Sequence, residues 1–89
     1  MTGRYLKVTF HKGKPLAPYL YLPRTGGAKV KRTAEAGQGL LVDFGPNETP
    51  IGIEITAPSA VTIADVNAVL AGLGLDSLPE AEWAPLRAA

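Results

Sequence analysis

The sequence predicts an α+β domain, with a four- to five-stranded, mostly antiparallel β-meander followed by a C-terminal helix packed on the sheet. Apolar residues alternate with a period of two through much of residues 1–57, as in half-buried strands. After residue 58 the period becomes three or four, as in an amphipathic helix. The 10 Gly and 8 Pro separate the strand-like runs. We therefore expect one domain, residues 1–89, divided into a β-meander over 1–57 and a helical segment over 58–89.

The strongest strand signal lies at residues 39–57, GLLVDFGPNETPIGIEITA. Two apolar runs flank GPNET, in which Gly and Asn tolerate a positive φ and Pro removes a ladder donor. This predicts a hairpin with a long loop. Alternation places three side chains of each run on one face, and these six form the expected core: Leu40, Val42, Phe44, Ile51, Ile53 and Ile55.

Three weaker strands are expected before this hairpin. Residues 5–10 alternate clearly. Residues 19–22 lie between Pro18 and Pro23, and because proline cannot donate to a ladder, we expect this strand to be short or at an edge. Residues 29–33 suit a strand with one cationic face, and residues 34–38 suit a loop.

A capping signal marks the start of the helix. Thr62 is a good N-cap, and Asp65 at the third helical position completes a box-like pattern. Gly72 or Gly74 supplies the C-terminal stop. A last helical turn carries Trp83 as a packing anchor, and we expect Pro85 to interrupt it. The helix has an apolar stripe that must cover the sheet or another subunit, made of Ile63, Val66, Val69, Leu70 and Leu73.

Charge is strongly segregated along the chain. The first 34 positions carry eight basic residues and no acid, whereas the remainder carries eight acids against Arg87. The N-terminal part is thus +8 and the rest −7. Such asymmetry favours an anionic partner, although basic and acidic strands that pair within the sheet or across a dimer would give the same pattern. The residues that we expect on a cationic, nucleic-acid-binding face are Lys7, Lys29, Lys31 and Arg32.

Chemistry-bearing residues are few. The chain has no Cys and a single histidine, His11, so a thiolate metal site and a multi-histidine metal site within one chain are excluded. Asp43 and Glu54 alternate opposite to the apolar faces of their strands, which places both carboxylates on the solvent-facing side of the sheet. We expect Glu54 to pair with a lysine or arginine and Gly52 to admit the ring of Tyr19 or Tyr21. We expect neither an enzyme nor a bound cofactor or metal.

Size and apolar content set further expectations. A chain of 89 residues buries roughly two thirds of its unfolded surface, so modest stability favours a homo-oligomer, with a dimer the simplest case. The first ten residues have no long apolar region, and no run approaches the length of a membrane span. The chain is therefore expected to be cytoplasmic and to have no membrane partner.

Four motifs carry a resemblance to a known family. L-Y-L at 20–22, V-x-R-T at 30–33, G-L-L-V-D at 39–43 and I-G-I-E-I at 51–55 are similar to the L-Y-I, V-x-x-T, G-V-x-V-D and V-G-I-E-I of the small bacterial domain-of-unknown-function family 2283. The match covers about residues 5–60. Two positions depart from the family. The acidic residue that members usually carry just before L-Y-I would fall near Pro18 and is missing here. The turn that is usually acidic reads Gly45-Pro46-Asn47.

The resemblance implies no established activity. Some members lie beside genes for small ribonuclease-type toxins, which implies an antitoxin-like partner role. Together with the residue patterns, this predicts a non-catalytic protein-interaction module, in which Asp43, Gly52 and Glu54 form a structural or partner site. The alternative is a nucleic-acid-binding domain that uses the basic N-terminal strands.

Overall fold

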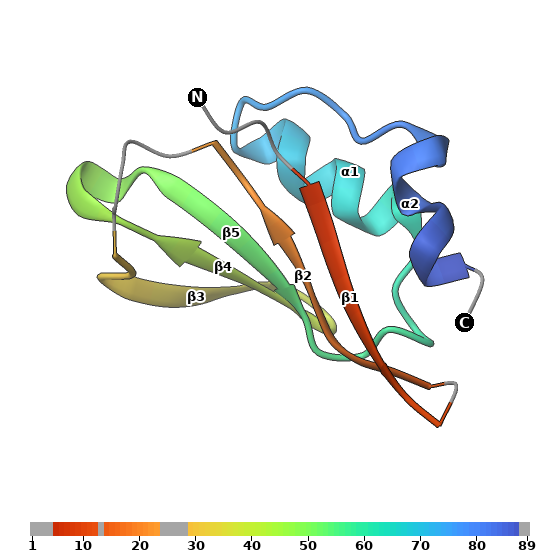
Figure 1. Ribbon diagram of the computed structural model, residues 1–89. Coiled ribbons are helices and arrows are strands. Elements are labelled where there is room, and N and C mark those ends of the chain that lie inside the picture. Colours follow the sequence, from red (N-terminus) through yellow and green to blue (C-terminus); the bar gives the residue numbers. More distant parts are fainter. Residues whose placement is uncertain (1–4, 13, 24–28, 88–89) are drawn as a thin grey trace.

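Five strands form one antiparallel sheet, and two helices lie on the same side of it (Figure 1). The computed structural model describes residues 5–12, 14–23 and 29–87. The sheet order is β1-β2-β5-β4-β3, so β1 and β3 are the edges. The α+β class and the sheet with a packed helix are confirmed. The strands are β1 Tyr5–His11, β2 Lys14–Tyr21, β3 Arg32–Gly37, β4 Leu40–Phe44 and β5 Pro50–Ile55, and the helices are α1 Ile63–Gly72 and α2 Glu80–Arg87.

The core lies between the sheet and the helices. Leu20 pairs with Ile53 and Ile53 with Val42, so one buried row crosses the three middle strands. Of the six expected core residues, Phe44 is half-buried and packs against this core, and the other five are buried. The helices add Val66, Leu70, Trp83 and Leu86, and the expected anchoring role of Trp83 is confirmed.

The prediction for β2 was wrong in both length and position. The strand has eight residues and lies between β1 and β5. A β-bulge explains how it accommodates proline, because the register with β1 shifts between the Lys7–Tyr19 and Thr9–Leu16 pairs, and Pro18 lies in this shift. Pairing with β5 begins only at Tyr19, so the proline removes no bond from that ladder.

The third strand begins and ends later than expected. β3 covers Arg32–Gly37, so the predicted loop at residues 34–38 is mostly strand, and Lys29 to Lys31 precede it. Ala, Glu and Gly have low β propensity, and the period-two signal is weak in such a segment. Tertiary pairing with β4 forms the strand instead, through a tight turn at Gln38 and Gly39, where Gly39 has φ 80°.

The helix signals are confirmed in atomic detail. The Thr62 hydroxyl accepts from the Asp65 N–H (3.2 Å), and the Asp65 carboxylate accepts from the Thr62 N–H (2.9 Å). At the other end, Gly74 has φ 76°, and the Leu75 N–H donates to the Leu70 carbonyl (2.9 Å). This is a Schellman stop with the glycine at its left-handed position.

A second helix follows a connection held by one side chain. The Asn67 amide accepts from the Leu78 N–H (2.6 Å) and donates to the Leu78 carbonyl (3.4 Å). Contrary to the prediction, α2 does not stop at Pro85 but continues to Arg87. Trp83 and Leu86 on either side of the proline are both in the core, and their burial offsets the missing backbone bond.

Candidate functional site

The face of the sheet opposite the helices is open (Figure 1), and we call it the open face. Two rows of paired residues cross it from β1 to β3. Each row takes one residue from each strand, so neighbours within a row lie about 5 Å apart. One row is Tyr5, Tyr21, Gly52, Asp43 and Thr33, and the other is Lys7, Tyr19, Glu54, Leu41 and Glu35.

Asp43 is the buried carboxylate of this face, with 8% of its surface exposed. One carboxylate oxygen accepts from the Tyr19 hydroxyl at 2.7 Å, and the other accepts from the Thr33 hydroxyl at 2.5 Å. Charge-assisted bonds of this kind are the stronger ones in proteins. Both oxygens therefore have partners from neighbouring strands, and Asp43 joins β2, β4 and β3 across the open face.

Gly52 makes this arrangement sterically feasible. Gly52 is buried between Tyr21 of β2 and Asp43 of β4, and a Cβ at its position would overlap the ring and hydroxyl of Tyr19. The Tyr19 ring thus lies over the glycine and spans β5. This confirms the expectation that a tyrosine ring covers Gly52 and explains why a strand so rich in isoleucine has a glycine here.

Glu54 lies on the open face, half-buried, as its alternation predicts. Its cross-strand partners are Tyr19 and Leu41. In the part of the chain that the structure describes, no ion pair joins Glu54 to a lysine or arginine. Arg4, Arg24 and the side chain of Lys14 lie outside that part, so the predicted pairing stays a prediction. Asp43 and Glu54 lie diagonally across β4 and β5, but the two oxygens of Asp43 are already bonded to hydroxyl groups.

The basic residues that were expected to share one face are divided between the two edges of the sheet. Lys7 is exposed on β1, whereas Arg32 begins β3 and Lys29 and Lys31 precede it. The two edge strands are four strand spacings, or about 19 Å, apart. Arg32 is also engaged, since its guanidinium lies 4.2 Å from the centre of the Phe44 ring and 2.5 Å from the Glu48 carboxylate.

The Arg32–Glu48 pair links β3 to the loop between β4 and β5. The Arg32 Nε donates to both carboxylate oxygens of Glu48, at 2.8 and 3.0 Å. This hydrogen bonding, with the attraction between the charges, lowers the pKa of Glu48 and raises the pKa of Arg32. Both side chains are exposed, so the pair fixes the loop more than it stabilises the fold.

No family model matches this chain. No curated protein and no solved structure matches it either. The resemblance to family 2283 therefore stays a prediction that rests on the four motifs. The structure adds a physical meaning to two of their residues, because Asp43 and Gly52 form one interlocked unit with Tyr19, which directly precedes the L-Y-L motif.

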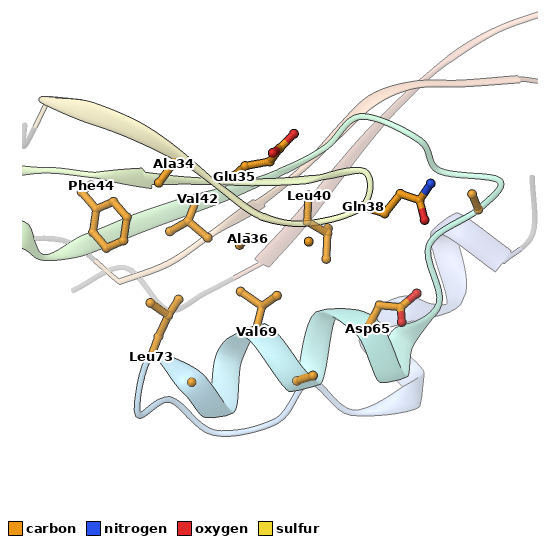
Figure 2. A pocket seen from close by; sticks show the side chains of 14 residues that line it. Ala34, Glu35, Ala36, Gln38, Leu40, Val42, Phe44, Asp65, Val69 and Leu73 are labelled. Atoms are coloured by element: carbon orange, nitrogen blue, oxygen red, sulfur yellow. The ribbon is translucent and has the colours of Figure 1, made fainter.

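A second feature lies on the helix side of the sheet, between β3, β4 and α1, and we call it the β3–α1 groove (Figure 2). It has a volume of about 600 Å³, within the range of ligand pockets. Small residues on both walls leave this space, Ala34 and Ala36 on β3 and Ala68 and Gly72 on α1. Leu40, Val42, Phe44, Val69 and Leu73 provide its larger apolar side chains.

Metal-binding clusters and membrane-spanning helices are two further features that bear on function. Among residues 5–12, 14–23 and 29–87, no three acidic or histidine side chains gather in a way that could hold a metal ion. None of the described helices has the length and apolar character needed to cross a bilayer. The side chain of His11 lies outside the described part of the chain.

Sequence reasoning missed two parts of these surfaces. Thr33 was expected on the solvated face of its strand and is exposed, but its hydrogen bond to Asp43 was not foreseen. Its signal was present, since a threonine in the V-x-R-T motif is paired with the aspartate of the next strand. The groove had no signal, because it arises from alanines on β3 that sequence patterns place in a loop.

Proposed function

We propose that the chain is a non-catalytic protein-interaction module, which binds a basic protein partner on its open face. The observation that carries the proposal is Glu54, a half-buried carboxylate without an ion pair in the described chain, flanked by Tyr19 and Leu41. Tyrosine and apolar side chains around a charge are typical of interface centres, where an arginine of the partner can meet both a carboxylate and an aromatic face.

The second tyrosine of β2 supports this assignment. The Tyr19 and Tyr21 rings meet edge to face, with centroids 4.7 Å apart, and both residues are half-buried. An aromatic pair held in this way loses little conformational freedom when a partner binds. Asp43, by contrast, is committed to internal hydrogen bonds, so we assign it a structural role that fixes Tyr19 beside Glu54.

The family resemblance suggests the kind of partner. In an antitoxin-like role the partner is a small basic toxin, and an arginine or lysine of that toxin would face Glu54. Among the described residues, the expected cationic residues lie at the two edges of the sheet and form no single surface that could follow a nucleic-acid backbone. We therefore prefer a protein partner to nucleic acid.

The experiment is an affinity capture from lysate of the native cell, with tagged wild type, Glu54→Gln and Glu82→Gln in parallel. Glu82 is an exposed carboxylate on α2, so its variant makes the same charge change away from the open face. We expect one protein to be retained by wild type and Glu82→Gln and lost from Glu54→Gln, whose free energy of unfolding should change by less than about 0.5 kcal/mol.

A high-salt wash separates the proposed partner from the alternative. A protein held by buried contacts should survive the wash, whereas nucleic acid should elute as salt rises. Recovery of nucleic acid alone, or a protein retained equally by Glu54→Gln, would contradict the proposal.

A further inference from the structure

The β3–α1 groove has different chemistry at its two ends. Figure 2 shows Gln38 and Asp65 at one end and Phe44 and Leu73 at the other. Asp65 and Leu73 are eight positions apart, and because a helix rises about 1.5 Å per residue, the groove extends about 12 Å between them. The groove thus has a polar end, an apolar end and the length for an elongated molecule.

The stretch between the two ends is apolar. Leu40 and Val42, which are buried residues of β4, line it from the sheet. Its sides carry the short side chains of Ala34 and Ala36 on β3 and of Ala68 on α1, which leave the space unfilled. An apolar chain that lay along this stretch would be removed from water, and the complex would be stabilised in proportion to the apolar area buried.

The polar end has one carboxylate directed toward a ligand. The charged residues of the lining are both acids, Glu35 and Asp65, and Figure 2 shows Glu35 pointing away from α1. Asp65 uses its Oδ2 atom to accept from the Thr62 N–H in the capping box. Because Asp65 is exposed, a ligand can reach its Oδ1 atom.

Two opposing charges decide which ligands this end attracts. The backbone N–H groups at the start of α1 carry about half a positive charge, whereas an ionised Asp65 carries a full negative charge. No basic side chain lines the groove in the described part of the chain. The carboxylate therefore outweighs the helix terminus, and the polar end attracts a cation and repels an anion. Gln38 adds an amide oxygen that can accept from the same cation.

We infer that the groove binds a small molecule with a primary ammonium head and an unbranched apolar chain. The ammonium donates to the Asp65 carboxylate and to the Gln38 amide oxygen, and its third N–H is left for water. The chain lies along the apolar stretch toward Phe44. This site is separate from the proposed protein partner of the open face, because the groove lies on the helix side of the sheet.

A free small molecule fits the groove better than a segment of a protein does. A lysine side chain has the right head, but its four-carbon stem is too short to extend from Asp65 to Leu73. A polypeptide backbone along the same path would place its amide groups against alanine methyl groups, and burying an amide without a hydrogen bond is unfavourable. An unbranched chain carries no such groups.

The test is an NMR titration of the backbone amides with n-octylammonium, which has the expected head on an extended apolar chain. n-Octanol and n-octanoate are the matched probes, because they carry the same chain with a neutral and an anionic head. We expect n-octylammonium to shift the amide signals of residues 34–38 and 65–73 until they saturate. n-Octanoate should bind at least about tenfold more weakly, since its carboxylate meets Asp65.

Two variants separate the head from the chain. Asp65→Asn keeps an oxygen for the Thr62 cap and removes the charge, so it should weaken n-octylammonium about tenfold and leave n-octanol unchanged. Ala68→Phe fills the groove from α1 and should weaken every probe at least about tenfold. Ala71→Phe, exposed on α1 outside the groove lining, and Glu54→Gln, on the open face, are controls and should bind as wild type does.

Several outcomes would overturn the inference. Groove signals that do not respond to n-octylammonium would do so, as would n-octanoate that binds as tightly as the ammonium. Wild-type affinity for n-octylammonium in either Asp65→Asn or Ala68→Phe would place the probe elsewhere. Groove signals that change with protein concentration alone would assign the groove to a second copy of the chain.

Discussion

The ring of Tyr19 lies directly over Gly52, in the place that a side chain at residue 52 would occupy. The tyrosine belongs to β2 and the glycine to β5, yet the tyrosine hydroxyl bonds to Asp43 on β4. The Tyr19 side chain thus crosses β5, because Gly52 has no side chain that would block the ring. The open face is consequently held by a lateral link as well as by backbone ladders.

Gly52→Ala should break this link. The new methyl group would displace the Tyr19 ring and remove a hydrogen bond to a charged, buried group, which costs about 2 kcal/mol. Chemical denaturation of the variant gives the change in the free energy of unfolding. In a Tyr19→Leu background the same substitution should cost much less, since the ring is already gone, and equal costs in both backgrounds would show that the two residues are not coupled.

Thr33→Val should destabilise the protein through the same carboxylate. Valine has the shape of threonine without the hydroxyl, so one oxygen of Asp43 would lose its donor, at a cost of about 1 kcal/mol because Thr33 is exposed and water can replace it. Thr33→Ser retains the hydroxyl and is the control. A serine variant as unstable as the valine variant would place the effect in the β-branched methyl group instead.

Much of the fold follows from local patterns. The hairpin of β4 and β5, the capping box of Thr62 and Asp65, and the glycine stop of α1 were all predicted, because each depends on residues close in sequence. The cover over Gly52 was also foreseen, from a glycine that has no reason to be in an apolar strand unless a ring approaches it.

The errors have a common physical cause, which is pairing that the local sequence does not encode. Pro18 suggested a short or edge strand, but a bulge absorbs it. Ala34 and Ala36 have weak strand propensity, and only pairing with β4 makes them a strand. The expected cationic face is divided because Lys7 and Arg32 lie on opposite edge strands, a result of strand order that charge counts along the chain do not show.

Gly72, the last residue of α1, and Gly74, just beyond the helix, should respond in opposite directions to substitution by alanine. Gly74 has φ 76°, where a Cβ is strained, so Gly74→Ala should destabilise the protein by about 1 kcal/mol. Gly72 lies within the helix and has open space around its Cβ position, so Gly72→Ala should stabilise it by up to about 1 kcal/mol. Thermal unfolding of both variants checks this, and changes of the same sign would rule out the assigned stop.

The Arg32–Glu48 pair should make a small contribution to stability that depends on pH. Because the pKa of Glu48 is lowered in the folded chain, the contribution is present above the pKa of an unfolded glutamate and is lost as pH falls through the lowered value. Carboxyl-detected NMR titration should find the pKa of Glu48 below its ordinary range in wild type and back within it in Arg32→Gln. Because both side chains are exposed, raising the salt concentration should reduce the difference in the Glu48 pKa between wild type and Arg32→Gln. A Glu48 pKa that is the same in both proteins would show that the pair does not persist in solution.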